Sequence, residues 1–294
     1  MNFGRLITAM ITPFNAGGQV NYEEAQKLAE YLLNNGSDSL VVSGTTGESP
    51  TLSKEEKSRL FAAVKEVTRG RAAMICGAST YNTAESLELS KAARQAGADA
   101  LLVVAPYYSK PPQEGLYQHF AAIAEAGGLP VILYNIPGRT GINILPQTFA
   151  KLAKIPNIVG VKDSTGNMDQ ISEVRMLAGK DFLIYSGDDS LTLPMLALGG
   201  AGVISVAAHL AGKQIKDMIE NFFAGNFAAA AEIHIGLFPL FKKLFLTANP
   251  IPLKYCLNKL GCQAGPCRLP LFGPEEKVCR ELDDLTAGMP KMVL

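Results

Sequence analysis

The chain has 294 residues, of which 48% are hydrophobic and 18% are charged, so it is long and apolar enough to bury a large core. Its 27 basic residues balance 27 acidic ones and neither sign forms a long block; we expect no nucleic-acid partner and no anionic lipid partner. The segment before Pro13 has no basic leader, long apolar run or cleavage site, which favours a cytoplasmic protein without a membrane span.

Cysteines and histidines are too scattered to indicate a metal centre. The five cysteines include no Cys-x-x-Cys pair and the three histidines no His-x-x-x-His pair, whereas zinc sites usually space paired ligands about two to four residues apart. We therefore expect reduced thiols and no metal. The role of four cysteines near the C-terminus stays open: Cys256, Cys262, Cys267 and Cys279.

Eight short apolar runs alternate with segments of helical periodicity. The runs are continuous rather than alternating, as in parallel strands covered on both faces. This pattern predicts an α/β fold of the (β/α)8 TIM barrel type; an open doubly wound sheet would carry a Gly-x-Gly-x-x-Gly turn after its first strand, which is missing here. The predicted strands are residues 6–11, 39–43, 72–77, 100–105, 131–135, 158–162, 182–187 and 202–206.

Helix starts and a C-terminal appendage are also predicted. Three pairs have capping-box spacing, in which a side chain caps the first turn and a carboxylate reaches back: Asn21 with Glu24, Ser53 with Glu56, and Asn82 with Glu85. After the eighth strand, three further helical stretches are expected near residues 213–247, 250–260 and 275–287. We therefore divide the chain into a barrel carrying the active site, residues 1–224, and a helical domain, residues 225–294.

Lys162 is a cation at the end of the apolar run Asn-Ile-Val-Gly-Val-Lys. An amine held partly out of water loses stability in its charged form, so its pKa falls from about 10.4 and it gains nucleophilic character at neutral pH. A surface lysine that merely closes a strand is the alternative on this run alone.

Polar or conformationally special residues follow several predicted strands. Because the C-terminal ends of barrel strands meet at one edge, we expect these residues to face one mouth. Each has a structural alternative: a turn for the threonines, packing for the tyrosines and a surface charge for the arginine. The set comprises Thr45, Thr46, Tyr107, Tyr108, Tyr134, Arg139, Gly187, Asp188 and Asp189.

Together with Lys162 the set is suited to imine chemistry. An amine that attacks a keto group gives an imine, whose adjacent carbon loses a proton to form an enamine. Tyr134 can shuttle protons and Thr45 can link it to a second tyrosine, while Thr46 offers donors to a carboxylate. Arg139 can grip a second carboxylate through two hydrogen bonds.

Six motifs carry a resemblance that covers essentially the whole chain. Gly-Thr-Thr-Gly-Glu-Ser, Ala-Pro-Tyr-Tyr, Tyr-Asn-Ile-Pro-Gly-Arg-Thr-Gly, Gly-Val-Lys-Asp-Ser-Thr-Gly, Ser-Gly-Asp-Asp and Asn-Pro-Ile-Pro-Leu-Lys resemble, in order and spacing, those of the dihydrodipicolinate synthases. The resemblance implies a (β/α)8 barrel with a C-terminal helical domain, no bound cofactor or metal, and condensation of pyruvate with aspartate semialdehyde on the route to lysine and diaminopimelate.

The resemblance also implies catalytic roles. Lys162 forms the Schiff base with pyruvate, and Tyr134 is the proton donor and acceptor. Thr45 and Tyr108 complete a proton relay, and Tyr108 is expected to reach the site from a neighbouring subunit. The active unit is then at least a dimer, and the family usually pairs dimers into homotetramers.

Four further residues are implied in substrate binding. Thr46 and the backbone at Ile204 hold pyruvate, Gly187 borders the substrate after the seventh strand, and Arg139 receives the carboxylate of the semialdehyde.

Other readings of the same barrel are sialic acid lyases, keto-deoxy sugar aldolases and a barrel that binds a keto acid without turnover. Sialic acid lyases typically have Ser-Thr in place of Thr45-Thr46, and neither aldolase group usually has an arginine in place of Arg139. A short acceptor with a carboxylate needs that arginine, which favours the synthase.

Feedback inhibition by lysine is expected to be weak or absent. The chain keeps Ser49, Glu85 and Tyr107 at places that match lysine-binding relatives. It carries Lys54 and Lys57 where sensitive enzymes often have histidines, and Tyr81 where they have asparagine, and ammonium groups repel a cationic ligand.

Overall fold

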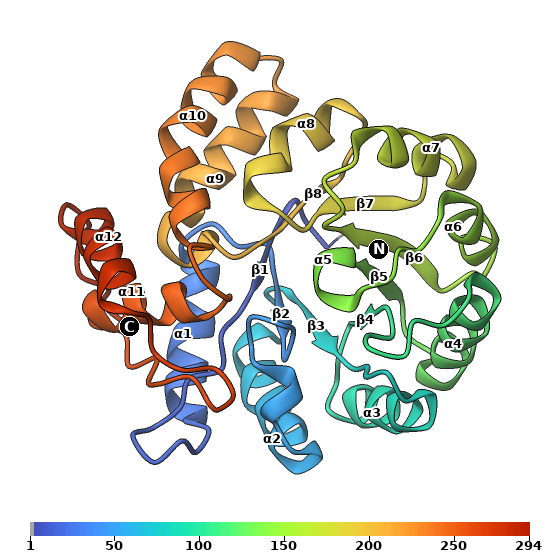
Figure 1. The fold of residues 1–294 in the computed structure, drawn as a ribbon, viewed down its shortest axis with the longest axis horizontal. Helices are drawn as coiled ribbons and strands as arrows, with labels where there is room; N and C mark the ends of the chain where they lie inside the picture. Colours follow the sequence, from blue (N-terminus) through green and yellow to red (C-terminus); the bar gives the residue numbers. More distant parts are fainter. Residues whose placement is uncertain (1–2) are drawn as a thin grey trace.

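The computed structural model describes residues 3–294, and its centre is a closed barrel of eight parallel strands (Figure 1). The strands pair in chain order, and β1 pairs with both β2 and β8. All eight predicted strands are present, with ends that shift by one or two residues. They are β1 (Leu6–Ala9), β2 (Ser39–Val42), β3 (Ala73–Gly77), β4 (Ala100–Val104), β5 (Val131–Asn135), β6 (Ile158–Asp163), β7 (Leu183–Ser186) and β8 (Gly202–Ser205).

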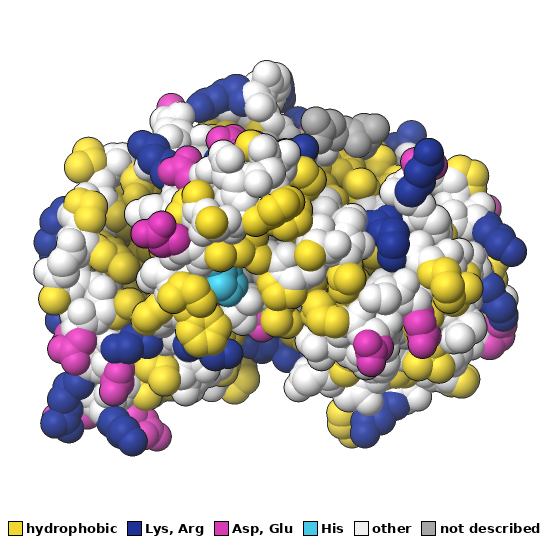
Figure 2. Space-filling model, turned by 90° about the horizontal axis from the view of Figure 1, so that it is seen from above, with side chains coloured by type: hydrophobic (Ala, Val, Ile, Leu, Met, Phe, Trp, Pro, Cys, Tyr) yellow, Lys and Arg dark blue, Asp and Glu magenta, His cyan; other side chains and the backbone are white. Residues whose placement is uncertain are grey.

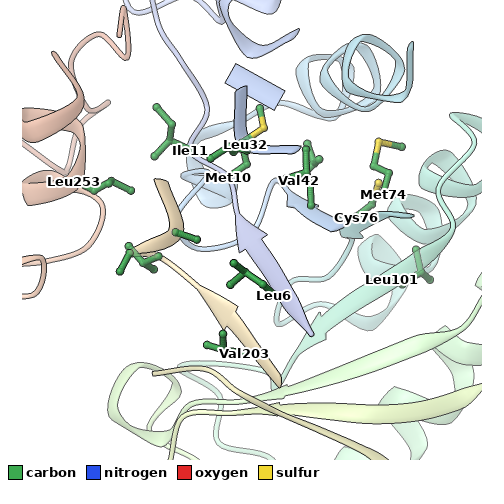
Figure 3. Packing of buried hydrophobic residues seen from close by; sticks show 14 of the residues in the cluster. Leu6, Met10, Ile11, Leu32, Val42, Met74, Cys76, Leu101, Val203 and Leu253 are labelled. Atoms are coloured by element: carbon green, nitrogen blue, oxygen red, sulfur yellow. The ribbon is translucent and has the colours of Figure 1, made fainter. Parts of the chain in front are cut away.

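Two apolar cores hold the barrel together, because successive side chains of a strand point to opposite faces. One core fills the interior and includes Ile7, Val41, Ile132 and Ile204. The other lies between the strands and the helices, where Leu6 and its neighbours in Figure 3 pack. Burial on both faces explains why the strands are apolar without alternation.

Helices surround the strands in a ring (Figure 1). Most links between strands contain one long helix, and β5 and β6 are joined by two short ones. The helices of the ring are α1 (Tyr22–Asn34), α2 (Lys54–Thr68), α3 (Thr83–Gln95), α4 (Gln113–Gly127), α5 (Pro137–Thr140), α6 (Pro146–Leu152), α7 (Met168–Ala178), α8 (Thr192–Ala197) and α9 (Ala208–Phe223).

The three predicted N-caps are present, but only one forms a reciprocal capping box. Ser53 and Glu56 exchange both hydrogen bonds. Asn21 caps α1, yet the Glu24 carboxylate accepts a hydrogen bond from the backbone N–H of Gln263 at 2.9 Å. The prediction of a box at Glu24 was wrong because a tertiary contact from the C-terminal segment takes that carboxylate.

The C-terminal helices pack on one flank of the ring (Figure 1). They are α10 (Phe227–Lys243), α11 (Ile251–Lys259) and α12 (Glu276–Thr286). The prediction of a single helix over 213–247 was wrong, since α9 ends at Phe223 and α10 begins at Phe227. Gly225 between them has a φ of 84°, a left-handed conformation that glycine adopts freely and that ends a helix. The domain boundary after residue 224 falls in this turn and stays a prediction.

Charges of both signs are interspersed with hydrophobic side chains on the face seen in Figure 2, in keeping with a net charge of zero. Among residues 3–294, no helix has the combination of length and apolar character needed to cross a bilayer.

Candidate active site

Strand register places Lys162 beside Tyr134 near the C-terminal ends of β6 and β5. Tyr134 belongs to the interior core of the barrel, and partners in parallel register project from the same face of a sheet. Lys162 Nζ lies 4.4 Å from the centroid of the Tyr134 ring. Both side chains are 5% exposed. The amine is therefore almost withdrawn from water and in contact with the tyrosine.

Lys162 has no ion pair within residues 3–294. The neighbouring carboxylate, Asp163, projects from the opposite face of β6, where it accepts hydrogen bonds from Thr165 and, at 3.3 Å, from Asn135. Burial raises the pKa of Asp163. A buried amine that is not engaged in an ion pair can approach a substrate carbonyl, which suits a nucleophile.

A cavity of about 200 Å³ opens at this end of the barrel. Thr45, Tyr107, Tyr134 and Arg139 line it, as predicted, and Lys57 lines it too. This cavity therefore brings together only part of the predicted set. Its wall does not include Thr46, Tyr108, Lys162, Gly187, Asp188, Asp189 or Ile204.

Gly187 makes a close approach to Lys162. An ideal Cβ at position 187 would lie 3.1 Å from Lys162 Cε and 2.0 Å from Ser164 Oγ. The backbone N–H of Gly187 also donates to Asp163 O at 2.7 Å. Glycine here leaves room for the lysine side chain and for the Ser164 hydroxyl, which is buried without a hydrogen-bond partner among the described residues.

Ile204 is fully buried in the interior core and is in register with Ile7 on β1. Its side chain therefore fills the barrel below the site. Ser205, the next residue, donates a hydrogen bond of 2.5 Å to Asp189.

Asp189 does not face the mouth, contrary to the sequence prediction. Its carboxylate is buried and accepts hydrogen bonds from Ser205 and from the backbone N–H groups of Val206 and Ala207 at 3.1 and 3.0 Å. Burial raises the pKa of Asp189, and these donors oppose the rise. The residue ties the loop after β7 to the end of β8.

Thr46 is turned towards the C-terminal segment rather than into the cavity. Its Oγ1 accepts a hydrogen bond from Asn249 Nδ2 at 2.9 Å, and Asn249 O accepts one from Arg139 Nη2 at 3.3 Å. Asn249 thus bridges two of the predicted substrate-binding residues. The sequence marks Asn249 only as the first residue of the Asn-Pro-Ile-Pro-Leu-Lys motif, and no role was predicted for its side chain.

Backbone strain is concentrated in two loops beside the cavity. Among residues 3–294, the non-glycine residues with positive φ are Ser43 and Glu48 after β2, and Tyr108 and Lys110 after β4. Left-handed conformations in such residues are unfavourable and often mark functional sites. Tyr108, with a φ of 69°, is 91% exposed. It projects away from the cavity of its own chain.

A buried ion pair beneath the first of these loops was missed. Glu48 Oε1 lies 2.6 Å from Lys254 Nζ, and both side chains are almost fully buried. Burial lowers the pKa of Lys254, and the charge of Glu48 opposes this. Its only sequence signal was a lysine inside the apolar helix α11.

Groups of three or more histidine, cysteine, aspartate or glutamate side chains that could hold a metal ion do not occur among residues 3–294. All five cysteines are free thiols.

Comparison with known proteins decides the family. The model of the dihydrodipicolinate synthetase family matches residues 2–287. The 4-hydroxy-tetrahydrodipicolinate synthase of Desulforamulus reducens is 58% identical over 284 residues, 96% of this chain and 95% of the relative. The chain belongs to the dihydrodipicolinate synthetase family. Its activity is that of a 4-hydroxy-tetrahydrodipicolinate synthase, a lyase of lysine biosynthesis.

Two solved structures of the family bear on its ligands. The enzyme of Cyanidioschyzon merolae with lysine bound is 48% identical, with a TM-score of 0.95 over 97% of this chain and 98% of that one. The chloride-inhibited enzyme of Acinetobacter baumannii complexed with pyruvate is 39% identical, with a TM-score of 0.94 over 98% of this chain and 100% of that one.

Substitution of Gly187 by alanine tests the close approach to Lys162. The added methyl group must displace Ser164 or Lys162, and an error of about 1 Å at a reacting group can cost about 10²-fold. We expect Gly187→Ala to lower kcat/KM by at least about tenfold in a synthase assay. Gly236→Ala is the control, because nothing lies within 4 Å of its ideal Cβ; equal activity in both variants would contradict the assignment.

Proposed function

We propose that Lys162 forms the Schiff base with pyruvate in the synthase reaction. The observation that carries the proposal is the buried Nζ, which lacks a carboxylate partner and contacts the Tyr134 ring. The amine attacks the keto carbon of pyruvate, and loss of water gives the imine. Loss of a methyl proton then gives the enamine.

The enamine carbon attacks the aldehyde of aspartate semialdehyde, which forms the new carbon–carbon bond and leaves a hydroxyl group. The amino group of the semialdehyde then replaces Lys162 at the imine carbon, which closes the ring and releases the enzyme amine. No electrons are gained or lost, and the single water released in imine formation completes the balance.

Proton transfer in these steps is assigned to Tyr134, Thr45 and Tyr108. Tyr134 is in contact with Lys162, and Thr45 lines the same cavity. A positioned tyrosine acts as a general acid and base when its hydroxyl reaches the reacting atoms. Tyr108 completes the relay from a second subunit.

Substrate binding is assigned to Thr46, Arg139, Gly187 and the backbone at Ile204. Arg139 lines the cavity, where a guanidinium can hold the semialdehyde carboxylate through two hydrogen bonds. Gly187 leaves space beside Lys162. Thr46 and the Ile204 backbone lie at the ends of β2 and β8 and are assigned to the pyruvate carboxylate.

Borohydride trapping tests the Schiff base. Incubation with pyruvate and borohydride reduces an imine to a stable amine, so peptide mass analysis is expected to find the pyruvate-derived mass on Lys162. Lys162→Ala should give no adduct and no turnover. Lys254 is an internal control, because it is as deeply buried but is paired with Glu48. An adduct on another lysine, with Lys162 unmodified, would refute the proposal.

Tyr108 supports an active unit of at least two chains. Its exposure of 91% and its strained backbone leave it outside the cavity of its own chain, whereas the family resemblance places its hydroxyl in the relay with Thr45. We assign its hydroxyl to the site of a neighbouring copy, within a homotetramer built as a dimer of dimers. The cytoplasmic location likewise stays a proposal.

Mixing two defective variants tests the shared site. Tyr108→Phe and Lys162→Ala, unfolded and refolded together, form mixed dimers in which one site has both native residues. We expect activity well above the sum of the two separately refolded variants. If Tyr108 acts within its own chain, every mixed site is defective and no activity returns.

Feedback inhibition by lysine is proposed to be weak or absent. Lys57 is 5% exposed and lines the cavity. Burial lowers the pKa of Lys57, and Glu85 raises it. Tyr81 packs edge-on against Tyr107, with centroids 5.2 Å apart. Two ammonium groups about 4 Å apart repel by about 4 kcal/mol at an effective dielectric constant of about 20, so a cationic effector is disfavoured here.

Inhibition by L-lysine in a synthase assay checks this proposal. We expect little inhibition of the wild type at sub-millimolar lysine. Lys57→Gln should increase lysine affinity by about tenfold or more, because it removes the buried charge. Lys54→Gln should have little effect, since Lys54 is exposed and lies 3.8 Å from Glu88. Strong inhibition of the wild type would overturn the proposal.

A further inference from the structure

Two residues of the C-terminal segment, Lys254 and Arg268, contact Glu48 in the loop after β2. The Glu48 carboxylate has no exposed surface, and its two oxygens have different partners. Oε1 lies 2.6 Å from Lys254 Nζ, and Oε2 accepts a hydrogen bond of 2.8 Å from the backbone N–H of Arg268. Both partners are more than 200 residues away in sequence.

Glu48 in turn closes the turn that presents Thr45 and Thr46. Its backbone N–H donates to Thr45 O at 3.0 Å, and its φ of 54° is left-handed. Such a conformation persists only where surrounding contacts impose it. The contacts of the Glu48 side chain therefore act on the same turn that carries both threonines.

Lys254 is itself rigidly held. Its Nζ donates to Pro266 O at 3.0 Å and lies 4.1 Å from the centroid of the Phe14 ring. The preceding residue, Leu253, belongs to the outer core that also contains Met10 and Ile11 at the end of β1 (Figure 3). The ammonium is a fixed point on the barrel rather than a flexible surface charge.

Asn249 makes a second tie from the same segment, through Thr46 Oγ1 and Arg139 Nη2. Lys254 and Asn249 thus contact Glu48 and Thr46, two residues of the same loop. A helical appendage that only covered the barrel would not need a buried charge and a buried amide at this point, because burying a charge is costly unless it is paired.

We propose that Glu48 and Lys254 are positioning residues for the synthase reaction, which hold Thr45 and Thr46 in the orientation that binds pyruvate and relays its protons. The inference rests on the roles proposed above for the two threonines. It assigns the C-terminal domain a part in forming the pyruvate site.

Three variants and a control test the inference. Lys254→Met and Glu48→Gln each break the pair, and the double variant replaces both charges with neutral groups of similar length. The control is Lys65→Met, which breaks another partly buried ion pair. Lys65 Nζ lies 2.8 Å from the carboxylate of Asp99, which precedes β4 at the opposite end of the barrel. Each is assayed for kcat, for KM of pyruvate, for borohydride trapping as a function of pyruvate concentration, and for melting temperature.

We expect both single variants to raise the KM of pyruvate by about tenfold or more and to lower kcat, because the loop loses its fixed point. The double variant should melt closer to the wild type, since removing both members of a buried pair is far less damaging than removing one. It should nevertheless keep the raised KM. Lys65→Met should melt lower with unchanged KM.

Wild-type kcat and KM in a folded double variant would overturn the inference, as would single variants whose activity falls only in proportion to their unfolded fraction. If neither single variant folds, the double variant alone decides. Failure of the proposed function gives a different result: wild-type enzyme would then show no trapped adduct on Lys162, whatever the state of the Glu48–Lys254 pair.

Discussion

The site depends on the register of a closed parallel barrel. With β5 and β6 paired so that Tyr134 lies opposite Lys162, the ring and the amine must project into the same interior. A slip of one residue would send every side chain of the strand to the other face. Such a slip would exchange Lys162 and Asp163 between the interior and the helix-facing side and would disrupt the packing of both cores. The packing of the cores thus fixes how Tyr134 and Lys162 lie relative to one another.

Three lysines are buried in this fold, and their surroundings give them different properties. Lys254 has a carboxylate at 2.6 Å, Lys57 has the more distant charge of Glu85, and Lys162 has no ion pair among the described residues. A nearby anion favours the ammonium form, whereas an apolar setting disfavours it. Burial alone does not distinguish the three; the absence of a carboxylate partner among the described residues sets Lys162 apart, in keeping with the role proposed for it.

The strands and the buried position of Lys162 were predictable because their signals are local. A continuous apolar run ending in lysine is visible in six residues, and the end of β5 is marked in the same way by Tyr134. The break at Gly225 was missed because helical periodicity continues on both sides of it. The contacts of Glu24 with Gln263 and of Glu48 with Lys254 were not predictable, since the partners lie more than 200 residues apart and no local pattern specifies which distant groups meet.

Strain and long-range contacts occur at the same place for a physical reason. A non-glycine residue in a left-handed conformation costs about 1–3 kcal/mol and persists where surrounding contacts impose it. The buried pair with Lys254 and the donor from Arg268 add long-range contacts to the local hydrogen bond between the Glu48 N–H and Thr45 O. Tyr108 has the same strain after β4 but is 91% exposed, with no comparable anchor in its own chain. A strained, exposed aromatic residue is stabilised when it is packed and its hydroxyl is bonded. The two loops therefore differ in their contacts within residues 3–294: the C-terminal segment contacts the loop after β2, whereas the Tyr108 side chain after β4 is left exposed, as its proposed place in the site of a neighbouring copy requires.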